Sequence, residues 1–152
     1  MPQENNRTNK GLLVWGQANP EAMADSYKGV YLNSQDMRDM VQQIDEKKRK
    51  GENVPVLIEH TGGSIGHVVS AWIHNNTLQC ILELENKTLE SAIGQEMVRS
   101  GVVRELSLGY LLDIQQTKSG LDAKRKYLRE ISIVKKGARD KCRILGLSSG
   151  KH

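Results

Sequence analysis

The strongest constraint on this chain is a nearly continuous run of strand-forming sequence, VPVLIEHTGGSIGHVVSAWIHNNTLQCILELE, over residues 54–85. Pro55 biases Val54 away from helix, so the run is expected to begin in an extended conformation. TGGS indicates a turn, and Asn75–Asn76 is typical of a hairpin turn between two alternating segments. The run therefore predicts three consecutive strands, at residues 54–60, 65–74 and 77–85.

The rest of the chain predicts two helices and further strands. Ser34 is a good N-cap for a helix with apolar residues at helical spacing, and Thr88 is a good N-cap for a second, shorter helix that ends at Gly101. The second helix is expected to bury an apolar stripe formed by Leu89, Ala92, Ile93 and Met97. The first helix is expected at residues 35–49, the other strands at 11–16, 102–114, 127–135 and 142–147, and polar connections at 17–29 and 115–126.

This set of elements predicts a mostly β protein with flanking helices, an α+β fold built on a small antiparallel β-barrel of five to seven strands. Closing such short strands into a barrel removes exposed strand edges. The 152 residues indicate one domain, expected at residues 11–147 between a disordered tail at 1–10 and a flexible tail at 148–152. The chain has no Phe, so Leu, Ile, Val and Met should fill the core, with Trp15 and Trp72 as its large anchors.

Charge and motifs exclude several classes of protein. The net charge of +4 comes from local runs such as DEKKRKGEN and KKGARDKCR, which are typical of solvated loops and helix ends; a nucleic-acid partner is therefore not expected. The chain has no zinc-ligand spacing, P-loop or dinucleotide fingerprint, so neither a metal nor another cofactor is expected. Cys80 is expected to be a buried free thiol, and two cysteines are too few for a disulfide framework. No membrane span or signal peptide is expected.

Three residues form a candidate catalytic set. Ser107 lies in RELSLGYLL, on the strand face opposite its leucines, where a serine is either a small structural residue or a nucleophile. A serine nucleophile needs an adjacent base, and His60, at the expected end of a strand before a glycine turn, is the best placed of the four histidines. Glu130 in LREISIV would orient that base, or would instead pair with a nearby Arg or Lys.

The order of these motifs resembles the capsid-maturation proteases of viruses: the assemblin-type serine proteases of herpesviruses and the prohead proteases of tailed phages. GLLVWG opens the pattern, VPVLIEHTGGSIGHVV carries the histidine, ELSLGY the serine and REISIVKKGARDKCRIL the third residue. The resemblance covers roughly residues 11–147. It implies a serine endopeptidase with Ser107 as nucleophile, His60 as general base and Glu130 as third residue, where herpesvirus enzymes have a second histidine and phage enzymes typically an acid.

The resemblance also implies an oxyanion site in KKGARD, where Gly137 matches the glycine and Arg139 the second arginine of a herpesvirus GRR loop. Ala138 replaces the first arginine and keeps its backbone N–H. The implied substrates are scaffold and capsid precursor proteins, and the implied assembly is a homodimer. The implied location is the viral procapsid inside the host, in the bacterial cytoplasm for a phage or the nucleus for a herpesvirus-like virus. The alternative is a non-catalytic, basic β-barrel module that binds scaffold protein or nucleic acid.

Overall fold

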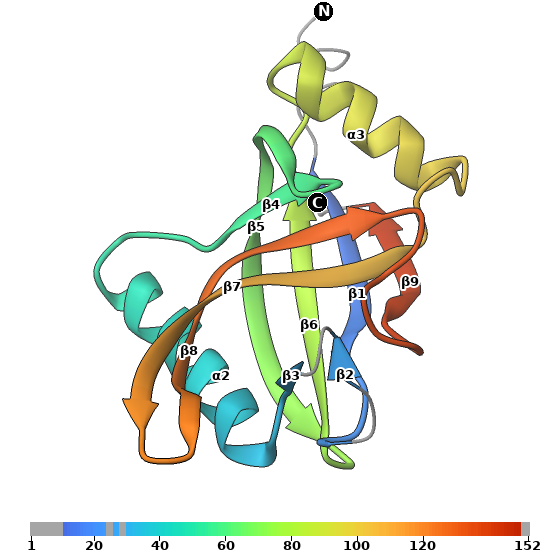
Figure 1. The fold of residues 1–152 in the computed structure, drawn as a ribbon. Helices are drawn as coiled ribbons and strands as arrows, with labels where there is room; N and C mark the ends of the chain where they lie inside the picture. The colour runs from blue at the N-terminus through green and yellow to red at the C-terminus, as the bar shows by residue number, and fades with distance from the viewer. Residues whose placement is uncertain (1–10, 24–25, 28–29, 150–152) are drawn as a thin grey trace, which may run out of the picture.

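The computed structural model describes residues 11–23, 26–27 and 30–149. A closed barrel forms most of it, with α2 and α3 at different ends of the barrel (Figure 1). In chain order the elements are β1 (Leu12–Asn19), β2 (Ser26–Tyr27), β3 (Val30–Tyr31), α2 (Ser34–Arg49), β4 (Pro55–Ile58), β5 (Thr61–His74), β6 (Thr77–Leu84), α3 (Leu89–Arg99), β7 (Glu105–Thr117), β8 (Gly120–Val134) and β9 (Arg143–Ser149).

Seven strands close the barrel in the order β1-β6-β5-β4-β8-β7-β9, and β9 pairs with β1 to complete the ring. Neighbouring strands are antiparallel except β4 and β8, which run parallel. The predicted fold class, a mostly β protein with flanking helices around a small barrel of five to seven mostly antiparallel strands, is confirmed.

Several segments expected to be loops or tails are strands. Residues 115–126, expected to be a polar connection, extend β7 and β8 into one long hairpin in which Thr117 pairs with Gly120. Here β7 and β8 pair with each other beyond the other strands of the barrel, and their sequence is largely polar. The alternation of apolar residues that indicates a barrel strand is therefore missing from this segment. β2 pairs with β3 where a loop was expected, and β9 runs to Ser149, beyond the expected domain end at 147. The expected tail at 1–10 lies outside the described residues, as do residues 150–152.

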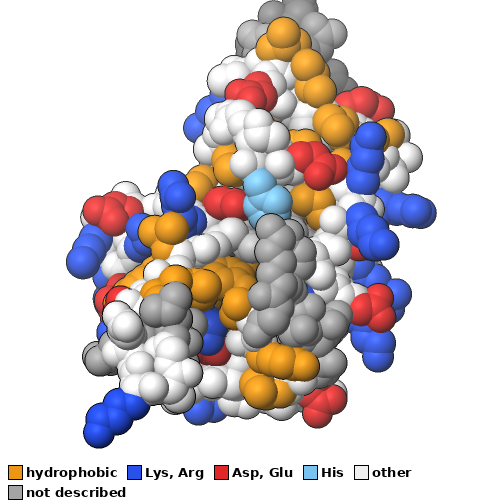
Figure 2. Space-filling model, viewed as in Figure 1, with side chains coloured by type: hydrophobic (Ala, Val, Ile, Leu, Met, Phe, Trp, Pro, Cys, Tyr) orange, Lys and Arg blue, Asp and Glu red, His pale blue; other side chains and the backbone are white. Residues whose placement is uncertain are grey.

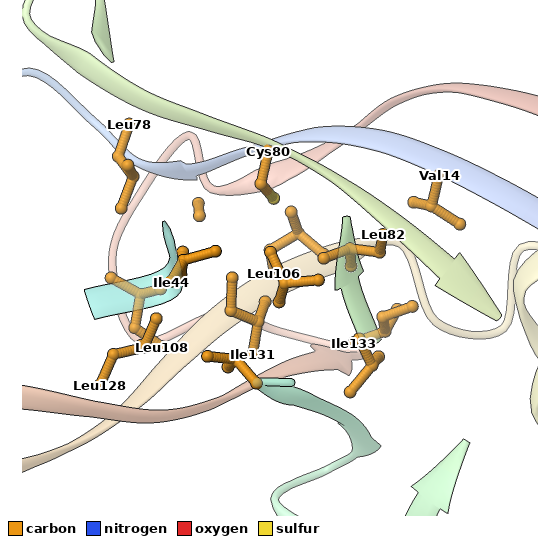
Figure 3. Packing of buried hydrophobic residues seen from close by; sticks show 14 of the residues in the cluster. Val14, Ile44, Leu78, Cys80, Leu82, Leu106, Leu108, Leu128, Ile131 and Ile133 are labelled. Atoms are coloured by element: carbon orange, nitrogen blue, oxygen red, sulfur yellow. The ribbon is translucent and has the colours of Figure 1, made fainter. Parts of the chain in front are cut away.

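Aliphatic side chains fill the barrel, and those from α2, β6, β7 and β8 point toward one another (Figure 3). The tryptophans are not its anchors: Trp15 is 45% exposed, and Trp72 is only partly buried. Trp15 faces outward on β1 because its neighbour Val14 takes the inward position, and its indole N–H donates to Gln79 Oε1 at 3.1 Å.

α2 packs against β5 and β8 and is fixed by its first turn. Asn33, one residue before the expected N-cap Ser34, accepts from the backbone N–H of Asp36 at 2.7 Å, and the Asp36 carboxylate accepts from Asn33 N–H at 2.9 Å. Asp36 also forms a buried ion pair with Lys126 of β8 at 2.9 Å. This pair ties the start of the helix to the long hairpin.

α3 buries mainly a different face from the one predicted, although Met97 of the predicted stripe packs against the core. Leu89 is 78% exposed and Ile93 is also exposed, because polar contacts and close packing fix the other side of the helix. The Gln95 amide donates to two backbone carbonyls at the end of β6, each at 3.1 Å, and Gly94 lies so close to Ile65 that a Cβ there would meet its Cδ1 at 2.8 Å. No helix among the described residues is long and apolar enough to cross a membrane.

Candidate active site

The register of β7 and β8 places four small or polar residues together on the outer face of the barrel. Ser107 pairs directly with Ser132, and Gly109 pairs with Glu130. Leu106 and Leu108 of β7 and Ile131 and Ile133 of β8, which alternate with them, are buried in the core. A rigid two-stranded ladder therefore fixes the separation between the predicted nucleophile and the predicted acid.

His60 approaches this face from the β4–β5 hairpin, because β4 lies beside β8. Ile58 pairs with Thr61, and the two residues between them, Glu59 and His60, have φ values of 55° and 60°. Positive φ at both positions of a two-residue hairpin is the signature of a type I′ turn. The predicted position of the turn is wrong: TGGS belongs to β5, and His60 lies in the turn rather than at a strand end.

The left-handed conformation of His60 is unfavourable for a residue with a Cβ, costing roughly 1–2 kcal/mol. Hydrogen bonds to β8 and the segment after it hold the turn in place. The His60 N–H donates to Ser132 Oγ at 2.9 Å, and the Glu59 N–H donates to Ile133 O at 3.2 Å. The Glu59 carboxylate accepts from Lys135 N–H at 2.8 Å. The surroundings thus stabilise a strained backbone at the predicted base.

The three residues predicted as a catalytic set form a continuous hydrogen-bonded chain. His60 Nε2 lies 2.9 Å from Ser107 Oγ, and His60 Nδ1 lies 2.7 Å from Glu130 Oε2. Ser132 Oγ donates to the other carboxylate oxygen, Glu130 Oε1, at 2.7 Å. Within the described residues Glu130 contacts His60 and Ser132, and it forms no ion pair with an Arg or Lys. This geometry suits proton transfer from a serine hydroxyl to an imidazole beside a carboxylate.

Gly109 provides the space that the Glu130 side chain occupies. A Cβ built on Gly109 would overlap Glu130 Oε2, and the backbone there is not left-handed, so the requirement is for space alone. Sequence reasoning missed the parts played by Gly109 and Ser132. The available signal was their spacing: a glycine two residues after the candidate nucleophile and a serine two residues after the candidate acid, on paired strands.

Ser107 and His60 open onto a cleft of about 830 Å³. Most of its other walls are apolar, formed by Val30, Leu108, Tyr110, Leu112 and Val134. On the face shown in Figure 2, one group of hydrophobic side chains lies below the histidine and others lie at the top and bottom, whereas Lys and Arg side chains stand mainly near the left and right margins. The cleft therefore suits a ligand with apolar side chains.

Ala138 and Arg139 line the same cleft, as expected for residues near the serine. Arg139 is only 4% exposed, so the alternative that it is a solvated surface charge is wrong. Its Nη2 donates to Val30 O and to the Tyr110 hydroxyl, each at 2.9 Å, while its buried Nε has no hydrogen-bond partner among the described residues. The Gly137 N–H, by contrast, donates to Glu105 Oε1 at 2.6 Å.

In the part of the chain that the structure describes, no group of three or more His, Cys, Asp or Glu side chains is arranged to hold a metal ion.

Burial raises the pKa of the Cys80 thiol from 9.0 to about 12, with a further contribution from Cys142. Cys80 is a buried free thiol, as predicted.

Comparisons with known proteins support the fold. No protein-family model matches the sequence, and no curated protein matches it. Nineteen chains of solved structures match the fold. One is the crystal structure of KSHV protease in complex with a hexapeptide phosphonate inhibitor, with a TM-score of 0.60 and 12% sequence identity. The match covers 92% of this chain and 66% of that chain, so this chain spans about two thirds of the length of its neighbour. The two chains share a fold of the assemblin type.

Proposed function

We propose that this protein is a serine endopeptidase. The observation that carries the proposal is the chain of contacts from Ser107 through His60 to Glu130, at 2.9 and 2.7 Å, on the wall of a large cleft. Three residues from three separate segments meet in the order that acyl transfer requires. A binding module has no need of this order.

In the proposed reaction His60 Nε2 accepts the proton of Ser107 as its Oγ attacks a peptide carbonyl. His60 later gives that proton to the leaving amine. In the second half of the reaction it takes a proton from the water that attacks the acyl-enzyme and returns it to Ser107 Oγ. Glu130 accepts the Nδ1–H of His60, which keeps Nε2 free to act as the base, and its charge stabilises the imidazolium.

Ala138 and Arg139 are proposed to stabilise the oxyanion. Both line the cleft with Ser107, and the guanidinium of Arg139 places a buried positive charge beside that cleft. The Gly137 N–H is already bonded to Glu105, so it is not assigned this role. Preorganised donors of this kind are usually the largest single contribution to acyl-transfer catalysis.

The open edge of β7 favours an extended polypeptide as substrate. β7 pairs with β8 along its whole length, but its ladder with β9 is confined to Glu105 and Arg143. The following residues of β7, including Leu108 and Tyr110, line the cleft. An extended chain can add to such an edge through its backbone while its alternate side chains enter apolar pockets.

The biological role that fits this proposal is viral capsid maturation. Its support is the order of sequence motifs that resembles assemblin and prohead proteases, together with the shared fold. The proposed substrates are scaffold and capsid precursor proteins, cleaved inside the procapsid in the host cell. A homodimer is proposed on the same resemblance.

A fluorophosphonate probe tests the proposed activity directly, because it reacts with an activated serine. We expect stoichiometric labelling at Ser107, located by peptide mass spectrometry, and none in Ser107→Ala. The exposed Ser100→Ala variant is the matched control and should label like the wild-type protein. Absence of labelling in folded wild-type protein would instead favour the non-catalytic binding module.

A further inference from the structure

The Ser132 hydroxyl bridges the backbone N–H of His60 and the Glu130 carboxylate, which also contacts the His60 ring. Ser132 is fully buried, at 0% exposure, and accepts the His60 N–H at 2.9 Å. The same oxygen donates its proton to Glu130 Oε1 at 2.7 Å. One hydroxyl therefore uses both its donor and an acceptor site within the candidate active site.

Each of these two bonds constrains a group that would otherwise be free to move. The left-handed φ of His60, 60°, is unfavourable, and the bond from its N–H to Ser132 stabilises this conformation. Glu130 has a flexible side chain that must reach sideways over Gly109, where a Cβ would overlap its Oε2. With that space open, the bond from Ser132 fixes the carboxylate so that Oε2 faces His60 Nδ1.

We propose that Ser132 is a positioning residue. It holds the His60 backbone and the far oxygen of Glu130, over the space left at Gly109, and so keeps the imidazole and the carboxylate aligned for their hydrogen bond. This inference rests on the proposed function for its effect on turnover, but its effect on the hydrogen bond between His60 and Glu130 does not depend on activity. In the described part of the chain the Ser132 hydroxyl bonds to His60 and Glu130 rather than to the Ser107 side chain, and it is not assigned a proton-transfer step.

The test compares Ser132→Ala with a matched control, Ser91→Ala. Ser91 is also buried, at 1% exposure, and its Oγ accepts from two backbone N–H groups at the start of α3, outside the site. Each alanine variant loses one buried hydroxyl that makes several hydrogen bonds. Ser132→Thr keeps the hydroxyl. The readouts are kcat and KM on a peptide substrate, the thermal midpoint, and the downfield proton resonance of the His60 Nδ1–H in the NMR spectrum.

We expect Ser132→Ala to lower kcat about tenfold to a hundredfold with little change in KM, the effect of misplacing a catalytic group by about 1 Å. The downfield resonance should broaden or disappear. Ser91→Ala should lower the thermal midpoint yet keep both kcat and the resonance, and Ser132→Thr should restore both. If Ser132 variants do not fold, Gly109→Ala displaces Glu130 from the other side and should also abolish the resonance.

A wild-type kcat and an unchanged resonance in Ser132→Ala would overturn the proposal. So would an equal loss of kcat in Ser91→Ala, which would show general destabilisation, or a wild-type spectrum without the resonance. If wild-type protein neither cleaves peptide nor reacts with fluorophosphonate, the proposed function fails. The resonance then still decides the positioning role, because its loss in Ser132→Ala supports that role and its persistence refutes it.

Discussion

Replacing Glu130 with glutamine should remove most of the turnover while leaving the protein folded. The amide keeps the shape of the carboxylate, but it has one donor group and one acceptor where the carboxylate has two acceptors. Both acceptors are in use: His60 Nδ1 lies 2.7 Å from Oε2, and Ser132 Oγ donates to Oε1 at 2.7 Å. In the variant one of these bonds must be lost or reversed.

The amide has two orientations, and Ser132 favours the inactive one. With its oxygen toward His60 the ring keeps its proton on Nδ1, but the NH2 group then faces Ser132 Oγ, and the Ser132 O–H loses the acceptor that it has in the carboxylate. With its oxygen toward Ser132 the existing bond survives, and the NH2 group donates to Nδ1. The ring proton then moves to Nε2, which cannot accept from Ser107. One neutral hydrogen bond of about 1 kcal/mol gives the inactive orientation a roughly fivefold preference.

Loss of the carboxylate charge beside the imidazolium adds to this bias. The comparable Asp-to-Asn change in a Ser-His-Asp protease lowers kcat by about 10⁴, or about 5.5 kcal/mol at 1.36 kcal/mol per decade. We therefore expect Glu130→Gln to lower kcat by about 10³–10⁴, with KM and the thermal midpoint nearly unchanged. The assay is steady-state cleavage of a peptide, with circular dichroism to verify folding.

A double variant separates the two contributions. Ser132→Ala removes the bias toward the inactive amide orientation, so the cost of Ser132→Ala should shrink or reverse when glutamine is present at position 130. A Glu130→Gln kcat within about tenfold of wild type would refute the orienting role. Strictly multiplicative losses in the double variant would refute the reasoning about tautomers.

Three further predictions concern other parts of the structure. Arg139→Ala should lower kcat by about 10²–10³ with a smaller change in KM, measured at low and high salt; a defect confined to KM that disappears at high salt would contradict an oxyanion role. Lys126→Met should reduce the free energy of unfolding by roughly 3–5 kcal/mol in urea titrations because it leaves Asp36 as an unpaired buried charge, whereas an effect below about 1 kcal/mol would mean that water reaches the pair. Cys80, whose pKa is raised to about 12 by burial, should react with a thiol reagent at pH 8 only after unfolding, and rapid reaction in the native protein would contradict this burial.

The sequence predicted the barrel because its strands carry apolar side chains on one face. The alternation around Ser107 places Leu106 and Leu108 in the core and the serine outside, as the structure does. Residues 115–126 of the β7–β8 hairpin are largely polar and pair with one another, so no such apolar signal exists for them. The buried face of α3 was mispredicted for a related reason: the contacts of Gln95 and the close approach at Gly94 are tertiary, and a helical wheel does not contain them.

The members of the candidate site were predictable, but the means of holding them was not. Ser107, His60 and Glu130 were found through motif order and a resemblance, and the structure brings them within hydrogen-bonding distance. The turn was misplaced because glycine usually supplies positive φ, whereas here a histidine adopts it with support from Ser132. That support depends on the parallel register of β4 and β8, which local sequence does not specify.

The parallel seam between β4 and β8 has a consequence for when the site forms during folding. The β4–β5 hairpin carries His60, and the β7–β8 hairpin carries Ser107 and Glu130; each hairpin is held by contacts close in sequence. The hairpins meet through the β4–β8 pairings, such as Val56 with Ile131, and through the hydrogen bonds of the His60 turn to β7 and β8, all of which are distant in sequence and costly in chain entropy. We therefore expect a newly made chain to form both hairpins, each with its part of the site, before the complete site is assembled. Pairing of β4 with β8 would then be the folding step that must be complete before Ser107 can act on a substrate.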